Sequence, residues 1–275
     1  MNILRLLILT LIAVTICTIS RAENIWDTGY RKVLVEDTAR LEVIYAHIAN
    51  DRIKNKQKVN YEMLSVGDKK MVYGGYGTYQ LDSIYTNFTV MPSPEERLKI
   101  IREYEPIKES ITIDPEKDTL NFYGNIFTNY YKYSEPIPKI NWTLTDDTEE
   151  IMGYECHKAT AKWRGREWNA WYADIPINAG PWKFQGLPGL IMKVEDTESD
   201  HSIYAISLEK FIYPIGHTYA GYTKTTRDKY NEAEKDHAAN AAKTFINSGM
   251  ITLKSEEERK TIAKRRLFHA PIELE

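Results

Sequence analysis

Cysteine is nearly absent from this chain, whose 275 residues include two, Cys17 and Cys156. Cys17 lies in an N-terminal segment that we expect to be removed, which leaves Cys156 without an intramolecular partner. Because a single thiol cannot form an internal disulfide, the fold must be held together by packing. Long apolar runs are also missing, since the run from Leu6 to Ile19 is shorter than the ~20 residues that a membrane-spanning helix needs.

The N-terminus has the features of a secretory signal. A basic residue precedes the apolar run, and Ser20-Arg21-Ala22 follows it, with small residues at the third and first positions before a cut. We predict cleavage before Glu23 and export through the inner membrane, giving a soluble periplasmic or extracellular product. The alternatives are an uncleaved anchor and lipidation of Cys17, where Ile16 replaces the small residue that a lipobox requires.

An excess of positive charge is missing as well. The formal net charge is −3, and it becomes −5 once residues 1–22 are removed, because they contain two arginines and no acidic residue. This mild acidity argues against nucleic acid as a partner. The remaining residues, 23–275, suffice for one sizeable core, and we predict that they form a single domain.

Alternating apolar residues predict strands over most of the mature chain. The clearest hairpin has His157–Trp163 as its first strand, Arg164-Gly165 as its turn and Trp168–Tyr172 as its return strand. The polar stretch 146–150 is interpreted as a solvated turn. Further strands are predicted at Tyr61–Val66, Lys70–Tyr73, Tyr79–Ser83, Leu120–Phe127, Tyr130–Tyr133, 190–195 and 202–208.

Helix signals occur at one internal segment and at the C-terminus. Ser93 starts a capping box, and Pro106 ends the helix that follows it. From about 222 to 267 the period becomes helical, with an N-cap signature at Thr225 and a second capped helix after Ser255. We predict an α+β fold, in which a curved, half-barrel-like antiparallel sheet has the C-terminal helices packed across it.

The most unusual segment, residues 171–191, combines aromatic residues with three prolines and three glycines and carries little charge. The prolines favour a stiff ribbon outside any sheet. The ribbon either seals the end of the sheet, with Trp182 and Phe184 as plugs, or forms the lip of an apolar cleft. The predicted binding residues are Trp168, Trp171, Tyr172, Asp174, Trp182, Phe184, Gly186, Leu187, Pro188 and Gly189.

Motifs that carry chemistry are scarce. Cys156 and His157 are adjacent in a predicted strand, so their side chains point to opposite faces and cannot form a nucleophile–base pair. The six histidines are scattered without metal-ligand spacing. Asp174 is either a desolvated acid or the cap of an Asx-turn. We predict no catalytic residue, no metal and no cofactor.

Several strings resemble one family. They are Trp142-Thr143-Leu144, the segment from Gly153 to Ala159, the ribbon with Gly186 to Ile191 reading GLPGLI, and Pro271 to Leu274. The chain is similar to the GLPGLI family that this string names. The resemblance implies a secreted or periplasmic protein of Bacteroidota-type bacteria, associated with outer-membrane TonB-dependent receptors, and it supplies no established catalytic residue.

Three functions from different classes remain open. The leading hypothesis is an envelope binding or accessory protein that takes an apolar or amphipathic ligand or a peptide and assists a TonB-dependent receptor. Its curved sheet would be analogous in architecture to half-barrel lipoprotein carriers. The first alternative is a hydrolase or a thiol-dependent enzyme that uses Cys156 or Asp174. The second is a structural partner of an outer-membrane complex, which would expose a large apolar patch.

Overall fold

A computed structural model describes residues 24–107, 109–249, 255–262 and 267–275. The predicted signal segment 1–22 and its cleavage site lie outside the described residues. All strands in the described ranges belong to one large sheet of 13 strands that is mostly antiparallel and does not close on itself. No helix in the described ranges is long and apolar enough to cross a membrane.

The sheet has the strand order β13-β7-β6-β5-β4-β3-β2-β12-β11-β10-β9-β8, with β1 paired to β2. The strands are β1 (Ile25–Asp27), β2 (Lys32–Asp51), β3 (Lys56–Gly67), β4 (Met71–Gly75), β5 (Ser110–Asp114), β6 (Thr119–Ile126), β7 (Asn129–Pro136), β8 (Thr143–Ile151), β9 (Tyr154–Trp163), β10 (Arg166–Ala173), β11 (Leu190–Asp196), β12 (His201–Thr218) and β13 (Thr223–Lys224). The helices are α2 (Tyr76–Thr86), α3 (Pro94–Tyr104), the 3-10 turn η2 (Pro115–Lys117), α4 (Arg227–Asn247) and α5 (Glu256–Ile262).

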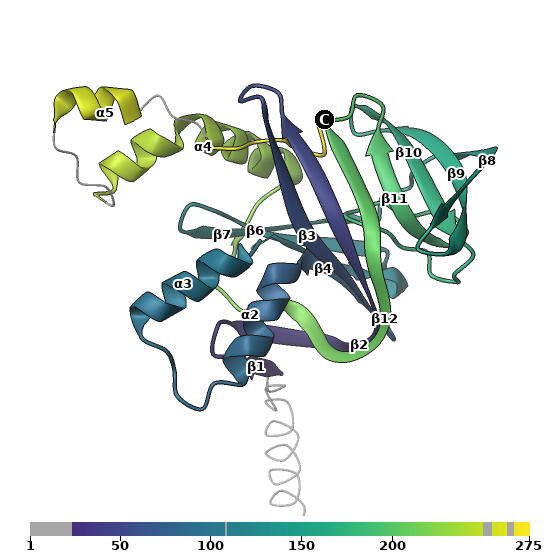
Figure 1. Ribbon diagram of the computed structural model, residues 1–275, viewed down its shortest axis with the longest axis horizontal. Coiled ribbons are helices and arrows are strands. Elements are labelled where there is room, and N and C mark those ends of the chain that lie inside the picture. Colours follow the sequence, from purple (N-terminus) through teal and green to yellow (C-terminus); the bar gives the residue numbers. More distant parts are fainter. Residues whose placement is uncertain (1–23, 108, 250–254, 263–266) are drawn as a thin grey trace, which may run out of the picture.

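The long strands β2 and β12 pair along almost their whole length in the middle of the sheet. On either side of them the sheet bends, so that β4–β7 and β8–β11 form two flanks (Figure 1). Helices α2 and α3 lie together near the point where strand β12 bends (Figure 1). Helix α4 contacts β6 and β7. The predicted α+β composition, with a large antiparallel sheet and C-terminal helices, is confirmed.

Local signals placed several elements correctly. The hairpin of β9 and β10 pairs Trp163 with Arg166, and Arg164 and Gly165 both have positive φ, which is the geometry of a two-residue type I′ turn. The capping box at Ser93 is present on α3, whose last residue is Tyr104. The N-cap of α4 is Thr226, one residue after the predicted position.

Two predictions are wrong. Residues 79–83, predicted as a strand from their tyrosines, belong to α2, where Gly77, Leu81 and Tyr85 are buried at helical spacing. The stretch 146–150, interpreted as a turn, belongs to β8. That strand is an edge of the sheet with exposed carboxylates, and charged side chains are a common protection of an open edge.

The ribbon predicted over residues 171–191 is shorter in the structure, because 171–173 belong to β10 and 190–191 to β11. Residues 174–189 have neither helix nor strand, as predicted. The ribbon fills the hollow between the two flanks of the sheet. Trp182 meets Phe122 of β6 edge to face at 6.1 Å, and Phe184 meets Trp168 of β10 at 4.7 Å between ring centroids. The ribbon therefore joins both flanks into one hydrophobic core.

We predict that Gly189→Ala destabilises the protein. A Cβ atom at Gly189 would lie 2.0 Å from the carbonyl oxygen of Ala173, so ribbon and strand would have to separate. We expect a loss of about 2–4 kcal/mol in the free energy of unfolding, measured by chemical denaturation. Gly221→Ala is the control, since a Cβ there meets nothing within 4 Å and should change stability by less than about 0.5 kcal/mol. Equal stability of the two variants would contradict this packing.

Candidate functional site

A cleft of about 930 Å³ opens between the sheet, α4 and the C-terminal tail, residues 267–275. Its volume lies in the range of ~300–1,000 Å³ that is typical of small-molecule sites. Strands β2 and β3 provide polar side chains, and the tail forms one wall. The apolar part of the lining includes Pro106, Ile107, Phe122, Tyr133, Trp182, Tyr230, Phe268 and Ile272.

The polar side of the cleft rests on a buried chain of hydrogen bonds. His47 Nδ1 lies 3.1 Å from Glu62 Oε1, and His47 Nε2 lies 3.0 Å from His201 Nδ1. His201 Nε2 lies 3.1 Å from the carbonyl oxygen of Pro271, and the Tyr73 hydroxyl donates to the other Glu62 oxygen. The chain thus connects β4, β3, β2 and β12 to the tail.

The geometry of this series of hydrogen bonds determines how many protons its members share. Pro271 supplies only an acceptor, so His201 carries its proton on Nε2 and accepts at Nδ1. Burial, together with the positive charge on His47, lowers the pKa of His201 to about 3, so this ring is neutral. The three bonds between the carboxylate, the two rings and the carbonyl together need three protons, a number that makes the cluster neutral as a whole.

Glu62 has the electrostatics that this arrangement requires. Burial acts to raise the pKa of its carboxyl, but the His47 charge and the hydrogen bonds from His47 and Tyr73 outweigh burial and hold the pKa below its usual value. The cluster is therefore neutral as a whole. It offers the cleft a rigid polar floor without an uncompensated charge.

Glu109 is a poorly satisfied carboxyl in the cleft. Among the described residues, the Tyr230 hydroxyl of α4 donates to it, at 3.4 Å from Oε1. The side chain is half-buried and lines the cleft. Burial, reinforced by the nearby charges of Glu234 and Glu62 and opposed by Lys58, raises the pKa of Glu109 to about 7. Carboxyls with this kind of shift in a cleft are common at functional sites.

The tail is fixed to the sheet by its backbone carbonyls. Arg166 donates from Nε to the Ile272 oxygen and from Nη2 to the Pro271 oxygen, both at 3.0 Å. The same guanidinium is paired with Asp196 at 2.7 Å and Asp200 at 2.8 Å. The two carboxylates orient the guanidinium, which then binds the tail.

Glu273 fixes the tail a second time, to the ribbon. Its carboxylate lies 2.7 Å from Lys183 Nζ, accepts from Trp182 Nε1 at 3.0 Å and is 3.1 Å from Arg227. Lys183 is fully buried and is also 2.7 Å from Glu135 of β7. Burial acts to raise the pKa of Glu273, but the Lys183 charge, the hydrogen bonds from Lys183 and Trp182 and the Arg164 charge together outweigh it and hold the pKa below its usual value.

The ten predicted binding residues do not lie together in the structure. Trp168, Phe184 and Leu187 lie in the core, so they cannot form a lip, because the ribbon turns them inward to fill the hollow. Their burial matches the sealing interpretation. Trp182 lines the cleft. Of the others, Trp171, Tyr172 and Gly189 are buried, and Asp174, Gly186 and Pro188 are exposed.

The two residues named for the enzyme alternative lie outside the cleft. Cys156 is packed in the core, and burial raises the pKa of its thiol to about 11, so it is not a reactive thiolate. Its sulfur contacts the Tyr154 carbonyl at 3.5 Å rather than a base. Asp174 is exposed. Within the described ranges no three His, Cys, Asp or Glu side chains are grouped to hold a metal ion.

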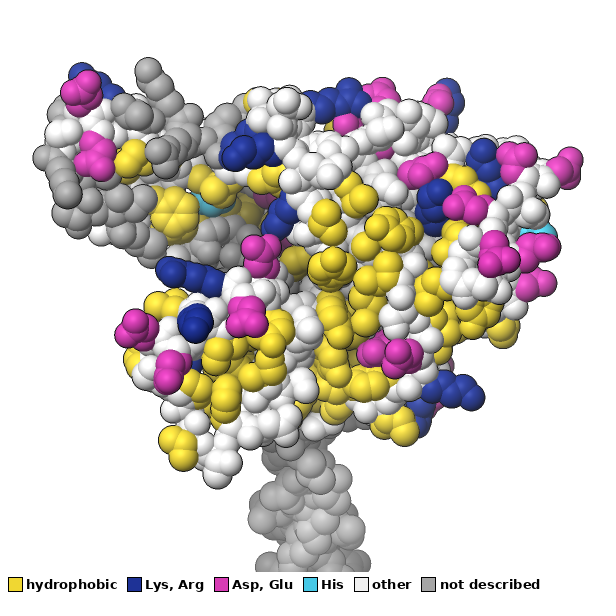
Figure 2. All heavy atoms as spheres, in the orientation of Figure 1, with side chains coloured by type: hydrophobic (Ala, Val, Ile, Leu, Met, Phe, Trp, Pro, Cys, Tyr) yellow, Lys and Arg dark blue, Asp and Glu magenta, His cyan; other side chains and the backbone are white. Residues whose placement is uncertain are grey.

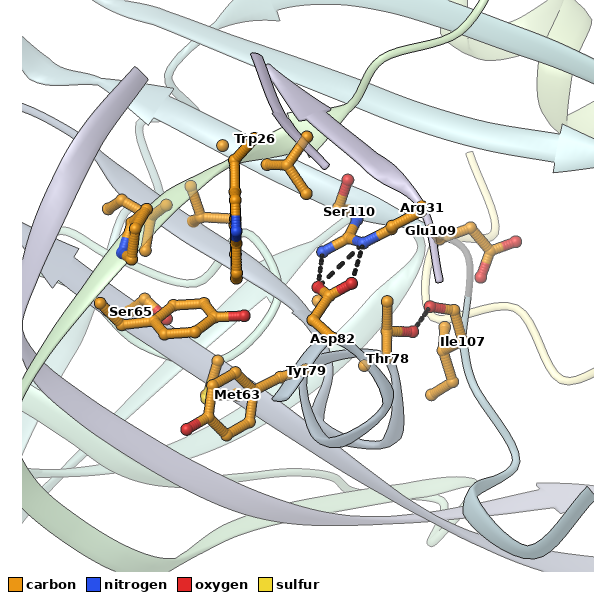
Figure 3. Close-up of a pocket in the computed structure, with 18 residues that line it drawn as sticks. Trp26, Arg31, Met63, Ser65, Thr78, Tyr79, Asp82, Ile107, Glu109 and Ser110 are labelled. Atoms are coloured by element: carbon orange, nitrogen blue, oxygen red, sulfur yellow. Dashed lines mark hydrogen bonds and ion pairs between the residues drawn. The ribbon is translucent and has the colours of Figure 1, made fainter. Parts of the chain in front are cut away.

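A second pocket, of about 50 Å³, lies between α2 and strands β3 and β4 (Figure 3). Arg31 and Asp82 form a 2.7 Å ion pair there, and Figure 3 shows the Glu109 carboxylate pointing away from that pair. A space of this size takes a few water molecules. The larger cleft is therefore the better candidate for a ligand site.

Sequence reasoning missed the polar residues of the cleft, although two local signals existed. His47 continues the inward face of Val43 and Tyr45, and Glu62 shares the inward face of Leu64. A titratable side chain on an apolar strand face is a recognisable sign of a buried partner. The partner itself, His201, is 154 positions from His47 and had no signal.

Comparisons with known proteins give a partial family match and a fold likeness. The model of a Bacteroidota-associated family, described as a protein of unknown function (Porph_ging), matches residues 164–193, from the β9–β10 turn to β11. A search of curated proteins finds no match. Two structures of PNGF-II, in the C2 and P21 space groups, are similar with a TM-score of 0.50 and identities of 15% and 14%.

The likeness to PNGF-II covers 74% of this chain and 34% of the PNGF-II chain, so this chain spans about a third of the length of those structures. At this low identity the likeness shows the fold alone.

We predict that Glu109→Gln makes stability less dependent on pH. A carboxyl whose pKa is raised from about 4.5 to about 7 stabilises the fold below pH 4.5 and loses that contribution as pH rises towards 7. Relative to the wild type, the variant should therefore gain roughly 1–3 kcal/mol in unfolding free energy between pH 5 and pH 8.

Denaturant unfolding at the two pH values measures this difference, and the comparison with the wild type cancels the contribution of His201. Glu103→Gln on the exposed face of α3 is the control and should show no such gain. A Glu109→Gln profile parallel to the wild type would show that Glu109 titrates normally.

Proposed function

We propose that this protein is an exported binding protein of the bacterial cell envelope, which holds an amphipathic ligand in the cleft between the sheet, α4 and the C-terminal tail. The observation that carries the proposal is the cleft itself, with its volume of about 930 Å³ and its two unlike sides. Phe122, Trp182 and Tyr230 offer aromatic contact area to an apolar body.

The polar side suits a hydrogen-bonding end group. Glu62 and His47 are already satisfied by their own partners, so they shape the floor without needing a ligand. Glu109 and Tyr230 share one long bond and keep hydrogen-bonding capacity. An amide, hydroxyl or amine at the end of an apolar body would complete them, and a lipid-like molecule or an apolar peptide terminus has this chemistry.

Location and partner are further parts of the proposal. The basic start, apolar run and small residues of the first 22 positions support export, and the Bacteroidota-associated match supports an envelope of that kind. A TonB-dependent outer-membrane receptor is the partner we propose, from the GLPGLI resemblance. The bent sheet supports the analogy with half-barrel carriers in architecture only.

We predict that Trp182→Ala weakens ligand binding more than it lowers melting temperature. The probe is N-phenyl-1-naphthylamine, an apolar fluorophore with one N–H group. Loss of the indole should raise its Kd about tenfold, because an aromatic contact contributes ~1–1.5 kcal/mol. Fluorescence titration gives the Kd, and thermal unfolding gives the melting temperature.

Trp142→Ala is the matched control. Trp142 is also half-buried beside the ribbon and donates its Nε1–H to the Gln185 oxygen at 2.8 Å, but it does not line the cleft. Its loss should leave the Kd within about twofold. Equal weakening in both variants, or no probe binding by the wild type, would count against the cleft. Mass spectrometry of the natively purified protein would then identify any co-purifying molecule.

A further inference from the structure

The outer face of the sheet, opposite the cleft, carries an exposed apolar patch. The register places Ile48 beside Val59, and Ala46 between Tyr61 and Tyr204, on one face of β3, β2 and β12. Val59, Tyr61 and Ile206 are 44%, 52% and 44% exposed. Figure 2 shows hydrophobic side chains gathered over these three strands, with a small group of carboxylates among them.

Two glutamates face each other on this surface. Glu42 of β2 lies directly opposite Glu209 of β12 in the strand register. Like charges at directly opposed positions destabilise an antiparallel pair. Glu209 is exposed and accepts a 3.3 Å hydrogen bond from Ser207. The pair therefore costs stability, and it persists in the centre of the sheet.

Glu42 is also buried without a partner. It is 7% exposed, and its Oε2 atom has no hydrogen-bond partner in the described part of the chain. No lysine, arginine or histidine of the described residues forms an ion pair with it. Burial, and then the charge of Glu209, raise the pKa of the Glu42 carboxyl. An unpaired buried carboxylate costs several kcal/mol in general.

Three other buried carboxylates have the cation that Glu42 lacks. Asp82 is 2.7 Å from Arg31, Glu62 is 3.1 Å from His47, and Glu273 is 2.7 Å from Lys183. Buried Asp51 has no ion pair among the described residues, but three backbone N–H groups, those of Ile53, Lys54 and His269, donate to it. Glu42 has neither kind of compensation, and Glu209 beside it makes a cation still more favourable.

Aromatic rings stand next to the two carboxylates. Tyr76 and Tyr79 of α2 stack with centroids 5.8 Å apart, and Phe211 meets Tyr79 edge to face at 5.7 Å. Tyr79 lines the same pocket as Ser65, which lies directly opposite Glu42 in the strand register. Burial, and then the charge of Glu42, raise the pKa of Tyr79 to about 12. Aromatic faces beside carboxylates attract an alkylammonium or guanidinium group, whose stem also contacts the rings.

We propose that Glu42 and Glu209, with Tyr76 and Tyr79, form a docking site for a lysine or arginine side chain of a partner protein. The partner segment carries apolar residues on either side of the cation, because the apolar patch over β2, β3 and β12 adjoins the site. Charge complementarity identifies this occupant, since the surface presents two carboxylates and no cation to balance them. Docking at this face is independent of ligand binding in the cleft.

A peptide titration tests the proposal. The probe is Ac-Ser-Leu-Lys-Leu-Ser-NH2, followed by amide chemical shifts in ¹H–¹⁵N NMR spectra, and a matched peptide has norleucine in place of lysine. We expect the lysine peptide to shift the signals of residues 42, 76, 79 and 209, with an affinity about tenfold higher than the norleucine peptide.

Glu42→Gln should weaken the lysine peptide about tenfold and raise the melting temperature of the free protein, because it removes the unpaired charge. Glu195→Gln is the control, since Glu195 lies on the same face but is paired with Lys193 at 3.5 Å, and it should change affinity less than twofold. Binding of the naphthylamine probe should be the same in both variants, which separates this site from the cleft.

Three results would overturn the proposal: equal affinity for the two peptides, unchanged binding by Glu42→Gln, or a lower melting temperature in that variant. Sedimentation adds one more outcome. A dimer that Glu42→Gln dissociates, without peptide binding by the wild type, would assign this face to a second copy of the chain and exclude the partner segment.

Discussion

The structure depends on one ammonium group that has no access to solvent. Lys183, at the centre of the proline-rich ribbon, lies 2.7 Å from both Glu135 of the sheet and Glu273 of the C-terminal tail. A buried charge is tolerated only when it is paired, so ribbon, sheet flank and tail have to assemble together. The contact that secures the ribbon in the hollow of the sheet therefore also builds the wall of the cleft.

The sequence predicts features that neighbouring residues determine. The β9–β10 hairpin and the capped helix α3 follow from two positive-φ turn residues and one capping box. Residues 79–83 were misassigned because tyrosines favour strands in general, whereas Leu81 and Tyr85 are buried by packing of α2 on the sheet. The site could not be predicted from the sequence for a related reason. His47 meets His201, and Lys183 meets Glu273, only after the whole sheet has formed.

The carboxylates on the two faces of the sheet differ in whether they have a cationic partner. On the inner face Glu62 and Glu273 are matched by cations, and Glu109, which has no ion pair among the described residues, has a pKa raised to about 7, which favours its neutral form below that pH. The cleft is therefore polar with little unpaired charge. On the outer face Glu42 and Glu209 stand opposed without a cation, beside exposed apolar side chains. A balanced interior favours a ligand chosen by shape and hydrogen bonding, and an unbalanced surface favours a charged partner. The ligand and the partner that we propose would therefore use separate surfaces.

A double-mutant cycle on Lys183 and Glu273 tests the central claim most directly. Lys183→Met or Glu273→Gln alone should each lower the unfolding free energy by about 3–5 kcal/mol, because each removes one charge from a buried network and leaves the charges around it with one partner fewer. The double variant should lose clearly less than the two single losses combined, by roughly 1 kcal/mol or more. If the two losses add within about 0.5 kcal/mol, the claim that this ion pair holds the tail in place is wrong.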